Sequence, residues 1–238
     1  MLRLREVHKS RGEGRQRYSL SIPHLDLRAG QQIAVVGPSG CGKSTLLDLL
    51  ALVLSPQRSG EFSLSLGDSR VDIAALWRDG RHDDLAHLRR QGFGYVLQTG
   101  GLLEFLDVRR NIGLPCQLLN LPVEEPVARL AARLEIADYL DHYPASLSVG
   151  QRQRVGIARA LVHGPRLVLA DEPTASLDPP TAARVMQLLV EQAREHNACT
   201  LVATHDEQLA RSAGLQIVPI HWQRDADGGV TATLAEAH

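Results

Sequence analysis

A run of glycines ending in a lysine and two hydroxyl residues is the part of this sequence best suited to chemistry. Residues 37–45 read GPSGCGKST, which fits the pattern G-x-x-x-x-G-K-[ST]. Glycines let the backbone turn tightly, so successive N–H groups point at one phosphate. Lys43 is then placed to bridge the β- and γ-phosphates of a nucleotide, and Ser44 to ligate Mg²⁺. The residues expected at the phosphates are Gly37, Ser39, Gly40, Cys41, Gly42, Lys43, Ser44 and Thr45.

Two carboxylates follow a second apolar run. Asp171 and Glu172 come directly after residues 167–170 (LVLA), which have the pattern of a buried strand. Ligands of parallel α/β sheets sit at the carboxyl ends of strands. Because successive strand side chains point to opposite sides, the two carboxylates are expected to act differently. We expect Asp171 to reach Mg²⁺, and Glu172 to polarise or deprotonate the water that attacks the γ-phosphate.

The elements that must position these groups alternate between strand and helix patterns. The expected strands are residues 2–7, 18–22, 32–36, 167–170 and 199–204, with a closing hairpin of 216–221 and 230–234 around Asp227. Pro23 is expected to interrupt the second strand. Residues 43–54 and 179–196 have helical patterns, the latter with Asp178 as N-cap, and residues 60–91 read as a long polar hairpin or loop.

This alternation predicts an α/β fold with a mostly parallel sheet, an N-terminal antiparallel β region and a helical subdomain. We expect one domain over 1–238, with a core of approximately 1–98 and 164–238. The helical subdomain would cover approximately 99–163.

Composition narrows the possible partners. The formal net charge is -1 and aromatic residues make up 4% of the chain, so we expect no nucleic-acid partner. The three cysteines form no metal-binding spacing and are expected to be free thiols in a reducing compartment. No apolar run approaches the roughly 18 residues that span a bilayer. We therefore expect neither export nor membrane insertion, and contact with a membrane only through a partner.

Residues 147–155 (LSVGQRQRV) closely resemble the signature of ABC ATPases, usually LSGGQ followed by a basic, glutamine-rich helix start. The resemblance continues through residues 171–175 (DEPTA), and 176–178 (SLD) resemble that family's D-loop. His205 resembles its switch histidine, and Gln98 its Q-loop glutamine. These motifs occur in the family's order and cover roughly residues 1–210.

The resemblance implies an ATP hydrolase that works as a dimer, either a homodimer or an ABC ATPase pair. It implies that two ATP molecules are sandwiched head to tail, each held by the phosphate loop of one copy and the signature of the other. The signature contacts would come from Ser148, Gly150 and Gln151, with Asp178 in the D-loop. His205 would hydrogen-bond the γ-phosphate, and Gln98 would sense the γ-phosphate and Mg²⁺.

Two departures from the family pattern leave questions open. Val149 replaces the glycine that is usually the third signature residue, and its β-branch narrows the backbone conformations available there. The aromatic residue that stacks on adenine in this family has no clear counterpart. Arg11 is slightly preferred because its planar guanidinium can stack on the base, and Tyr18 is the alternative. Cys41 lies inside the phosphate loop, so its alkylation is expected to block ATP binding.

Residues 100–115 resemble bacterial ATPases of the lipoprotein-release and macrolide-export type. Their apolar cluster is placed to receive a coupling helix from an integral membrane permease; it consists of Leu102, Leu103, Phe105 and Leu106. The resemblance implies a cytoplasmic subunit, peripheral on the inner membrane, that powers export or extraction. The alternative is a soluble ABC-type ATPase in cofactor assembly or another non-transport role. A P-loop small-molecule kinase would leave the signature and His205 unexplained.

Overall fold

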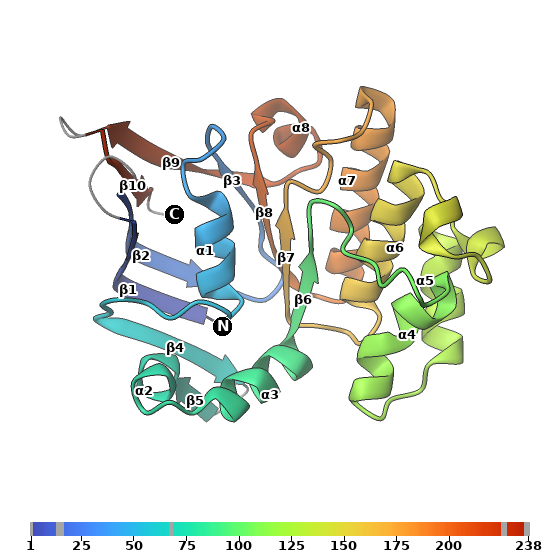
Figure 1. Cartoon of the computed structure of the whole chain (residues 1–238), viewed down its shortest axis with the longest axis horizontal. Helices are drawn as coiled ribbons and strands as arrows, with labels where there is room; N and C mark the ends of the chain where they lie inside the picture. The colour runs from blue at the N-terminus through green and yellow to red at the C-terminus, as the bar shows by residue number, and fades with distance from the viewer. Residues whose placement is uncertain (1, 13–16, 67–68, 225–227, 236–238) are drawn as a thin grey trace.

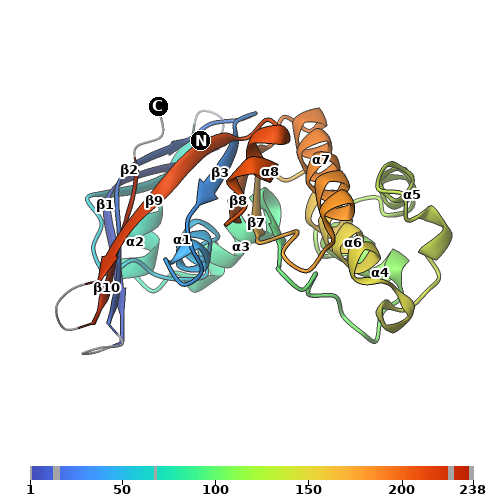
Figure 2. The same cartoon turned by 90° about the horizontal axis from the view of Figure 1, so that it is seen from above.

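A single curled β-sheet organises the chain (Figures 1 and 2). The computed structural model describes residues 2–12, 17–66, 69–224 and 228–235. Over these residues the sheet has ten strands in the order β5-β4-β1-β2-β10-β9-β3-β8-β7-β6. Their bounds are β1 (Leu2–Arg11), β2 (Tyr18–Leu27), β3 (Gln32–Val36), β4 (Glu61–Leu66), β5 (Ser69–Asp72), β6 (Phe93–Val96), β7 (Leu167–Asp171), β8 (Cys199–Thr204), β9 (Gln216–Arg224) and β10 (Val230–Leu234).

The two ends of the sheet differ in strand direction. Strands β9, β3, β8, β7 and β6 pair in parallel, whereas β2, β1, β4 and β5 pair antiparallel. Strand β10 joins the halves, because it is antiparallel to β9 and parallel to β2. The predicted α/β fold with an antiparallel N-terminal region is confirmed. The closing hairpin is also present, with β9 extending to Arg224; Asp227 of its expected turn lies outside the described residues.

The prediction that Pro23 interrupts a strand is wrong, because β2 continues through it to Leu27. Strand β2 pairs with β10 only over residues 18–21, so Pro23 lies beyond that ladder. On the other side the pairing with β1 passes from Arg5–His24 to Val7–Ile22, omitting Glu6, whose φ is 50°. A proline has no N–H to donate and is tolerated where no ladder hydrogen bond is needed.

Helix α1 (Lys43–Leu50) lies inside the curl of the sheet (Figure 2). Its leucines pack against the antiparallel strands and against one face of the parallel strands. The helix was expected to reach residue 54 but ends at Leu50, since Leu52 has a left-handed φ of 58°. This packing fixes the end of the phosphate loop relative to β7 and β8.

The opposite face of the parallel strands is covered by a second helical layer (Figure 1). It contains α6 (Val149–Leu161) and α7 (Pro179–Glu195), with α4 (Val108–Leu118) and α5 (Glu124–Arg133) farther out. Because side chains alternate between the two faces of a strand, each parallel strand contributes to both layers. Leu169 packs toward α1, whereas Val168 packs toward α6 and α7. Two short 3₁₀ helices, η2 (Ala137–Tyr139) and η3 (Pro144–Ser146), lead into α6.

Local capping signals place the helix starts as predicted. The Asp178 carboxylate accepts the Thr181 N–H at the start of α7, with Pro179 as first helical residue. Ser148 caps α6 in a reciprocal capping box with Gln151. Residues 60–91 hold more regular structure than expected: after the β4–β5 hairpin come α2 (Ile73–Arg78) and α3 (His82–Gly92). The short helix α8 (Glu207–Ser212) follows β8.

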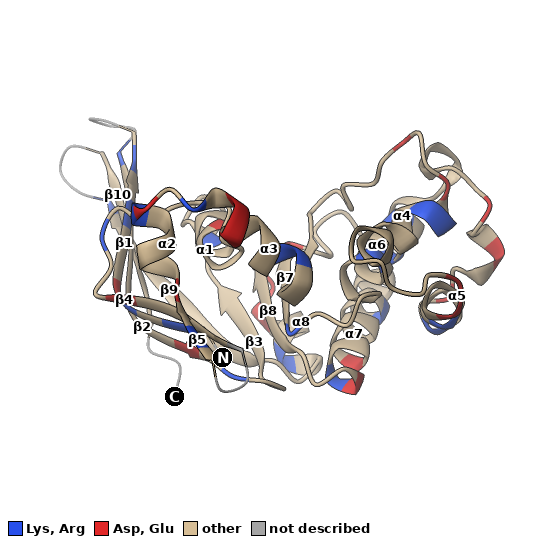
Figure 3. Cartoon of the chain, turned by 90° about the horizontal axis from the view of Figure 1, so that it is seen from below, with Lys and Arg blue, Asp and Glu red and all other residues tan. Residues whose placement is uncertain are grey.

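Charges of both signs are distributed over the helices (Figure 3). In α3, for example, Asp83 and Asp84 lie in the first turn and Arg89 and Arg90 in the last, which suits the helix dipole. Among the described residues, no helix is both long enough and apolar enough to cross a bilayer.

Candidate active site

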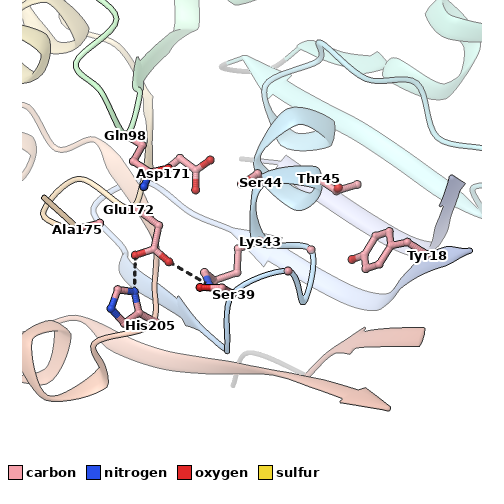
Figure 4. A pocket seen from close by; sticks show the side chains of 12 residues that line it. Tyr18, Ser39, Lys43, Ser44, Thr45, Gln98, Asp171, Glu172, Ala175 and His205 are labelled. Carbon is pink, nitrogen blue, oxygen red and sulfur yellow. Dashed lines mark hydrogen bonds and ion pairs between the residues drawn. The ribbon is translucent and has the colours of Figure 1, made fainter. Parts of the chain in front are cut away.

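The phosphate loop connects β3 to α1 at the carboxyl end of the parallel strands (Figure 4). Gly40 and Gly42 have φ values of 79° and 98°, which L-residues with side chains rarely adopt. The Lys43 ammonium is turned back into the loop, where Nζ donates to the carbonyls of Gly37 (2.8 Å) and Pro38 (3.1 Å). The Cys41 side chain is buried under the loop. Two backbone carbonyls of the loop therefore hold the Lys43 ammonium in place.

Tyr18, the first residue of β2, lies against this loop. Its hydroxyl donates to the Cys41 carbonyl at 3.1 Å, and burial raises the pKa of the phenol. A Cβ at Gly42 would lie 1.4 Å from the Tyr18 hydroxyl oxygen. Glycine is therefore required at position 42 by both the backbone conformation and this close approach.

Asp171, the last residue of β7, faces Ser44 at the start of α1. Burial raises the pKa of Asp171 overall, although a hydrogen bond from the Ser44 side chain acts in the opposite direction. Its Oδ1 is buried and has no hydrogen-bond partner within the described part of the chain. A buried oxygen without a donor, next to a hydroxyl, fits a hard cation such as Mg²⁺, which takes one or two protein oxygens plus phosphates and water.

Glu172 leaves the strand direction, with a left-handed φ of 44°. Its Oε1 lies 3.0 Å from Lys43 Nζ, and its Oε2 lies 2.9 Å from His205 Nδ1 (Figure 4). The Lys43 side chain is 5% exposed and the Glu172 side chain 13%, whereas His205 is 57% exposed. Asp171 and Glu172 therefore face different neighbours, and a left-handed backbone conformation at Glu172 accompanies its contacts with Lys43 and His205.

These side chains border one open cavity of 360 Å³. Its described lining brings together residues from five parts of the chain: Tyr18, Ser39, Gly40, Gly42, Lys43, Ser44, Thr45, Gln98, Asp171, Glu172, Ala175 and His205. Gln98 reaches it from the segment after β6, and His205 from the segment after β8. Ala175 was not expected there; its only sequence signal is its position within the 171–175 motif.

The remaining predicted residues lie away from this lining. Ser148, Gly150 and Gln151 lie at the N-terminus of α6, and Asp178 at the N-terminus of α7. Within α6 the Ser148 Oγ accepts the Gln151 N–H at 3.2 Å, and Gln151 Oε1 accepts the Ser148 N–H at 2.7 Å. Val149, beside them, is 44% exposed. The two predicted halves of the nucleotide site are thus not joined within one chain.

Arg11 is the exposed last residue of β1 and pairs with Tyr18 across the β1–β2 ladder. The described lining of the cavity contains Tyr18 and not Arg11.

Comparison with known proteins agrees with this geometry. The sequence profile of a family described as ABC transporter matches residues 20–175. The chain belongs to the ABC transporter family. It is accordingly an ATP-binding and ATP-hydrolysing cassette of that family. The sequence motifs of the phosphate loop and the signature, and the family profile, indicate the same ABC cassette fold.

The curated relatives include macrolide export proteins named MacB. The chain is 38% identical over 236 residues to the macrolide export ATP-binding/permease protein MacB of Marinobacter nauticus, covering 96% of this chain and 34% of that protein. The MacB protein of Escherichia coli is 37% identical over 217 residues, covering 90% and 32%. The chain thus spans about a third of the length of these curated relatives.

Two solved ABC structures superpose on 96% or more of this chain. A dimeric post-hydrolysis state of the ATP-binding cassette MJ0796, bound to ADP and Pi, has a TM-score of 0.79 and 29% identity, with 100% of both chains covered. The cbiO1 protein of Clostridium perfringens, part of the transporter complex cbiONQ, has a TM-score of 0.74 and 26% identity, with 96% and 86% covered.

Proposed function

We propose that two copies of this chain, or this chain and a related ABC ATPase, bind two ATP molecules between them. The observation that carries this proposal is the separation of Ser148, Gly150 and Gln151 from the cavity that contains Lys43. A helix N-terminus is an anion site, and at this one Ser148 and Val149 are exposed while Gly150 is buried. The Ser148 hydroxyl accepts a hydrogen bond within α6, so its own proton remains to donate to a phosphate held by the other copy. The relative MJ0796 is described as dimeric.

Each residue of the cavity would have its own role in ATP binding and hydrolysis. Lys43 would bind the β- and γ-phosphates within the phosphate loop, and Ser44, Asp171 and Gln98 would hold Mg²⁺. Bound Mg²⁺ offsets negative charge on the phosphates. Glu172 would accept a proton from the attacking water, and its contact with His205 Nδ1 fixes the carboxylate in place. The other ring nitrogen of His205 would be the donor to the γ-phosphate.

For the adenine contact we propose Tyr18 in place of Arg11. The Tyr18 ring borders the cavity and is fixed through its hydroxyl to the Cys41 carbonyl. A fixed aromatic ring loses little conformational entropy when a base stacks on it.

We further propose that a membrane permease docks in a second groove. This groove, of 480 Å³, lies where α3 and β6 meet α4 and α6, and apolar side chains such as Phe93, Leu103 and Leu118 line it. Phe105, nearby in sequence, is 74% exposed. The groove is also lined by Arg89, Arg90 and Arg159. An amphipathic helix of a membrane subunit would bury the apolar side chains and place acidic groups against these arginines. The names of the MacB relatives combine ATP binding with a permease, and export is the direction those names carry.

The same proposal places the chain at the cytoplasmic face of the inner membrane, through that partner. We also propose that the single domain consists of a core of approximately 1–98 and 164–238 and a helical subdomain of approximately 99–163. The docking groove lies between these two parts.

The ATP sandwich is tested with Glu172→Gln. This variant keeps the size of the side chain but removes the base, so hydrolysis should fall at least about 100-fold. ATP binding should be retained, and ATP with Mg²⁺ should convert monomer to dimer in sedimentation velocity experiments. A Glu172→Gln variant that stays monomeric at saturating ATP would contradict the proposal.

The partner site is tested in the same background. Ser148→Arg should still bind ATP but remain monomeric, because the arginine occupies the position proposed for the other copy's phosphate. Gln187→Arg is the matched control, since it adds the same charge to an exposed position of α7. Equal dimerisation of the two arginine variants would exclude residues 148–151 from the interface.

A further inference from the structure

Helix α6 is bonded directly to the loop that carries Gln98. The Gln153 Nε2 donates to the Leu97 carbonyl at 3.3 Å, and the Arg159 Nη2 donates to the Gly100 carbonyl at 3.0 Å. Gln98 lies between the two carbonyls that α6 binds. Gln153 is 3% exposed and Arg159 is half-buried, so both bonds are at least partly shielded from bulk water. Breaking either one would leave a buried polar group without a partner.

The backbone of the loop also packs tightly on α6. A Cβ at Gly156 would lie 3.1 Å from the Gly100 carbonyl oxygen, and a Cβ at Gly100 would lie 3.1 Å from the Arg152 carbonyl oxygen. Two glycines therefore allow the loop and the helix to touch. The loop has no room to slide toward α6, and the two bonds oppose its moving away.

A buried asparagine holds the far end of the same loop. Asn111 is fully buried; its Nδ2 donates to the carbonyls of Leu103 (3.0 Å) and Leu106 (2.9 Å), and its Oδ1 accepts the Leu103 N–H (2.9 Å). The Arg159 Nη1 lies 3.5 Å from that same Oδ1. Arg159 thus joins the start of the loop to its end, and it also lines the 480 Å³ groove proposed for the permease.

We propose that Gln153 and Arg159 are positioning residues that make the Gln98 loop and the signature end of α6 one mechanical unit. The inference rests on the proposed ATP sandwich and adds how its two parts are aligned. Gln98 borders the nucleotide cavity of its own chain, while Ser148 faces the other copy's nucleotide. A movement of either one therefore moves the other, and a helix docked in the groove acts on both through Arg159.

In the Glu172→Gln chain, this arrangement predicts that a variant of Arg159 changes the ATP concentration needed for dimerisation but not the monomer's affinity for ATP. A single chain binds ATP through its phosphate loop, so Arg159→Met should leave the monomer's ATP affinity within about twofold. The ATP concentration needed for half-dimerisation should rise about tenfold or more, since a partly buried charged hydrogen bond is lost. Arg159→Lys, which keeps the charge and one donor toward Gly100, should restore part of the loss. A general folding defect would impair both measurements together.

The matched control is Arg154→Met, an arginine of the same helix that bonds to Glu135 and not to the loop. If Arg159→Met folds poorly, Gln153→Met removes one neutral bond at similar volume, and it should raise the half-dimerisation concentration about threefold. Dimerisation of Gln153→Met or Arg159→Met at the ATP concentration of the control would overturn the inference. Absence of dimers in the parent Glu172→Gln chain would instead overturn the sandwich itself.

Discussion

Lys43 Nζ and Glu172 Oε1 form a nearly buried ion pair, 3.0 Å apart. The cation of the phosphate loop is thus paired with the carboxylate proposed as general base. Phosphate oxygens are the same kind of partner for an ammonium group, so ATP should compete with Glu172 for Lys43. The pair therefore links the folded stability of the chain to its nucleotide site.

A double-mutant cycle tests this pair. Without nucleotide, Lys43→Met and Glu172→Gln should each lower the free energy of unfolding, by about 1–3 kcal/mol, because each leaves a buried polar partner. The double variant should lose less than the sum, with a coupling energy of about 1–2 kcal/mol, measured by urea denaturation. The exposed pair Arg81–Asp84, at 2.7 Å, is the control and should show about 0.5 kcal/mol or less. Additive losses at Lys43 and Glu172 would show that the two side chains do not interact.

Two glycines of the phosphate loop separate backbone strain from steric clash. Gly40→Ala and Gly42→Ala both put a Cβ on a left-handed residue, which costs roughly 1–2 kcal/mol. No heavy atom lies within 4 Å of a Cβ at position 40, whereas one at position 42 meets the Tyr18 hydroxyl. Gly42→Ala should therefore destabilise the chain more than Gly40→Ala in thermal unfolding.

Adding Tyr18→Ala to both variants tests the cause of that difference. It should remove most of the extra loss in Gly42→Ala and give no such rescue in Gly40→Ala. An equal effect of Tyr18→Ala on the two variants would place Tyr18 away from the loop.

The sequence predicted those parts of the site that depend on interactions between residues close together in the chain. The phosphate loop lies between β3 and α1, and α7 begins after Asp178, because turn and capping signals act over a few residues. The role of Tyr18 was not fixed by such signals. Its contact with Cys41 spans 23 positions and exists only because the curled sheet brings β2 beside α1.

For helix α6, too, local sequence signals predicted the start of the helix but not its contacts with residues far away in the sequence. The motif at 147–155 indicated a helix start, and the capping box of Ser148 bears this out. Nothing local indicates that Gln153 binds the Leu97 carbonyl 56 positions away or that Arg159 binds Gly100. Polar residues in a helical pattern are ordinarily read as a solvated face. Packing against the loop buries Gln153 and half-buries Arg159.

Cys41, whose alkylation is expected to block ATP binding, should react slowly in the folded chain. Its thiol is buried, and burial raises its pKa, so little thiolate is present near neutral pH. In a chain with Cys116→Ala and Cys199→Ala, iodoacetamide should modify Cys41 on the order of 100-fold more slowly than glutathione at pH 7.5. Modification should accelerate as the pH rises, and modified chains should lose ATP binding. Labelling of the native chain as fast as glutathione would contradict the buried position.

Glu135 connects three helices at the outer edge of the molecule. It follows α5 with a left-handed φ of 58°, accepts from Arg184 Nε of α7 at 2.9 Å, and pairs with Arg154 Nη1 of α6 at 2.9 Å. The hydrogen bond from Arg184 is the main reason that the pKa of Glu135 is lowered. A lowered folded-state pKa stabilises the chain above the unfolded pKa, about 4.3, and the contribution is lost as pH falls through the folded value.

Glu135→Gln should therefore lower the melting temperature at pH 7 and have a shrinking effect below about pH 4. The loss at pH 7 should be about 1 kcal/mol or less, because the Glu135 and Arg184 side chains are each 45% exposed and screened by water. Glu125→Gln, which breaks the exposed i,i+4 pair with Arg129, should cost only about 0.3–0.5 kcal/mol at pH 7. Differential scanning calorimetry of both variants from pH 3 to pH 8 measures these losses. A difference between wild type and Glu135→Gln that grows toward acid pH would reverse the sign argued here and exclude the ionised Glu135 as the stabilising partner of Arg184.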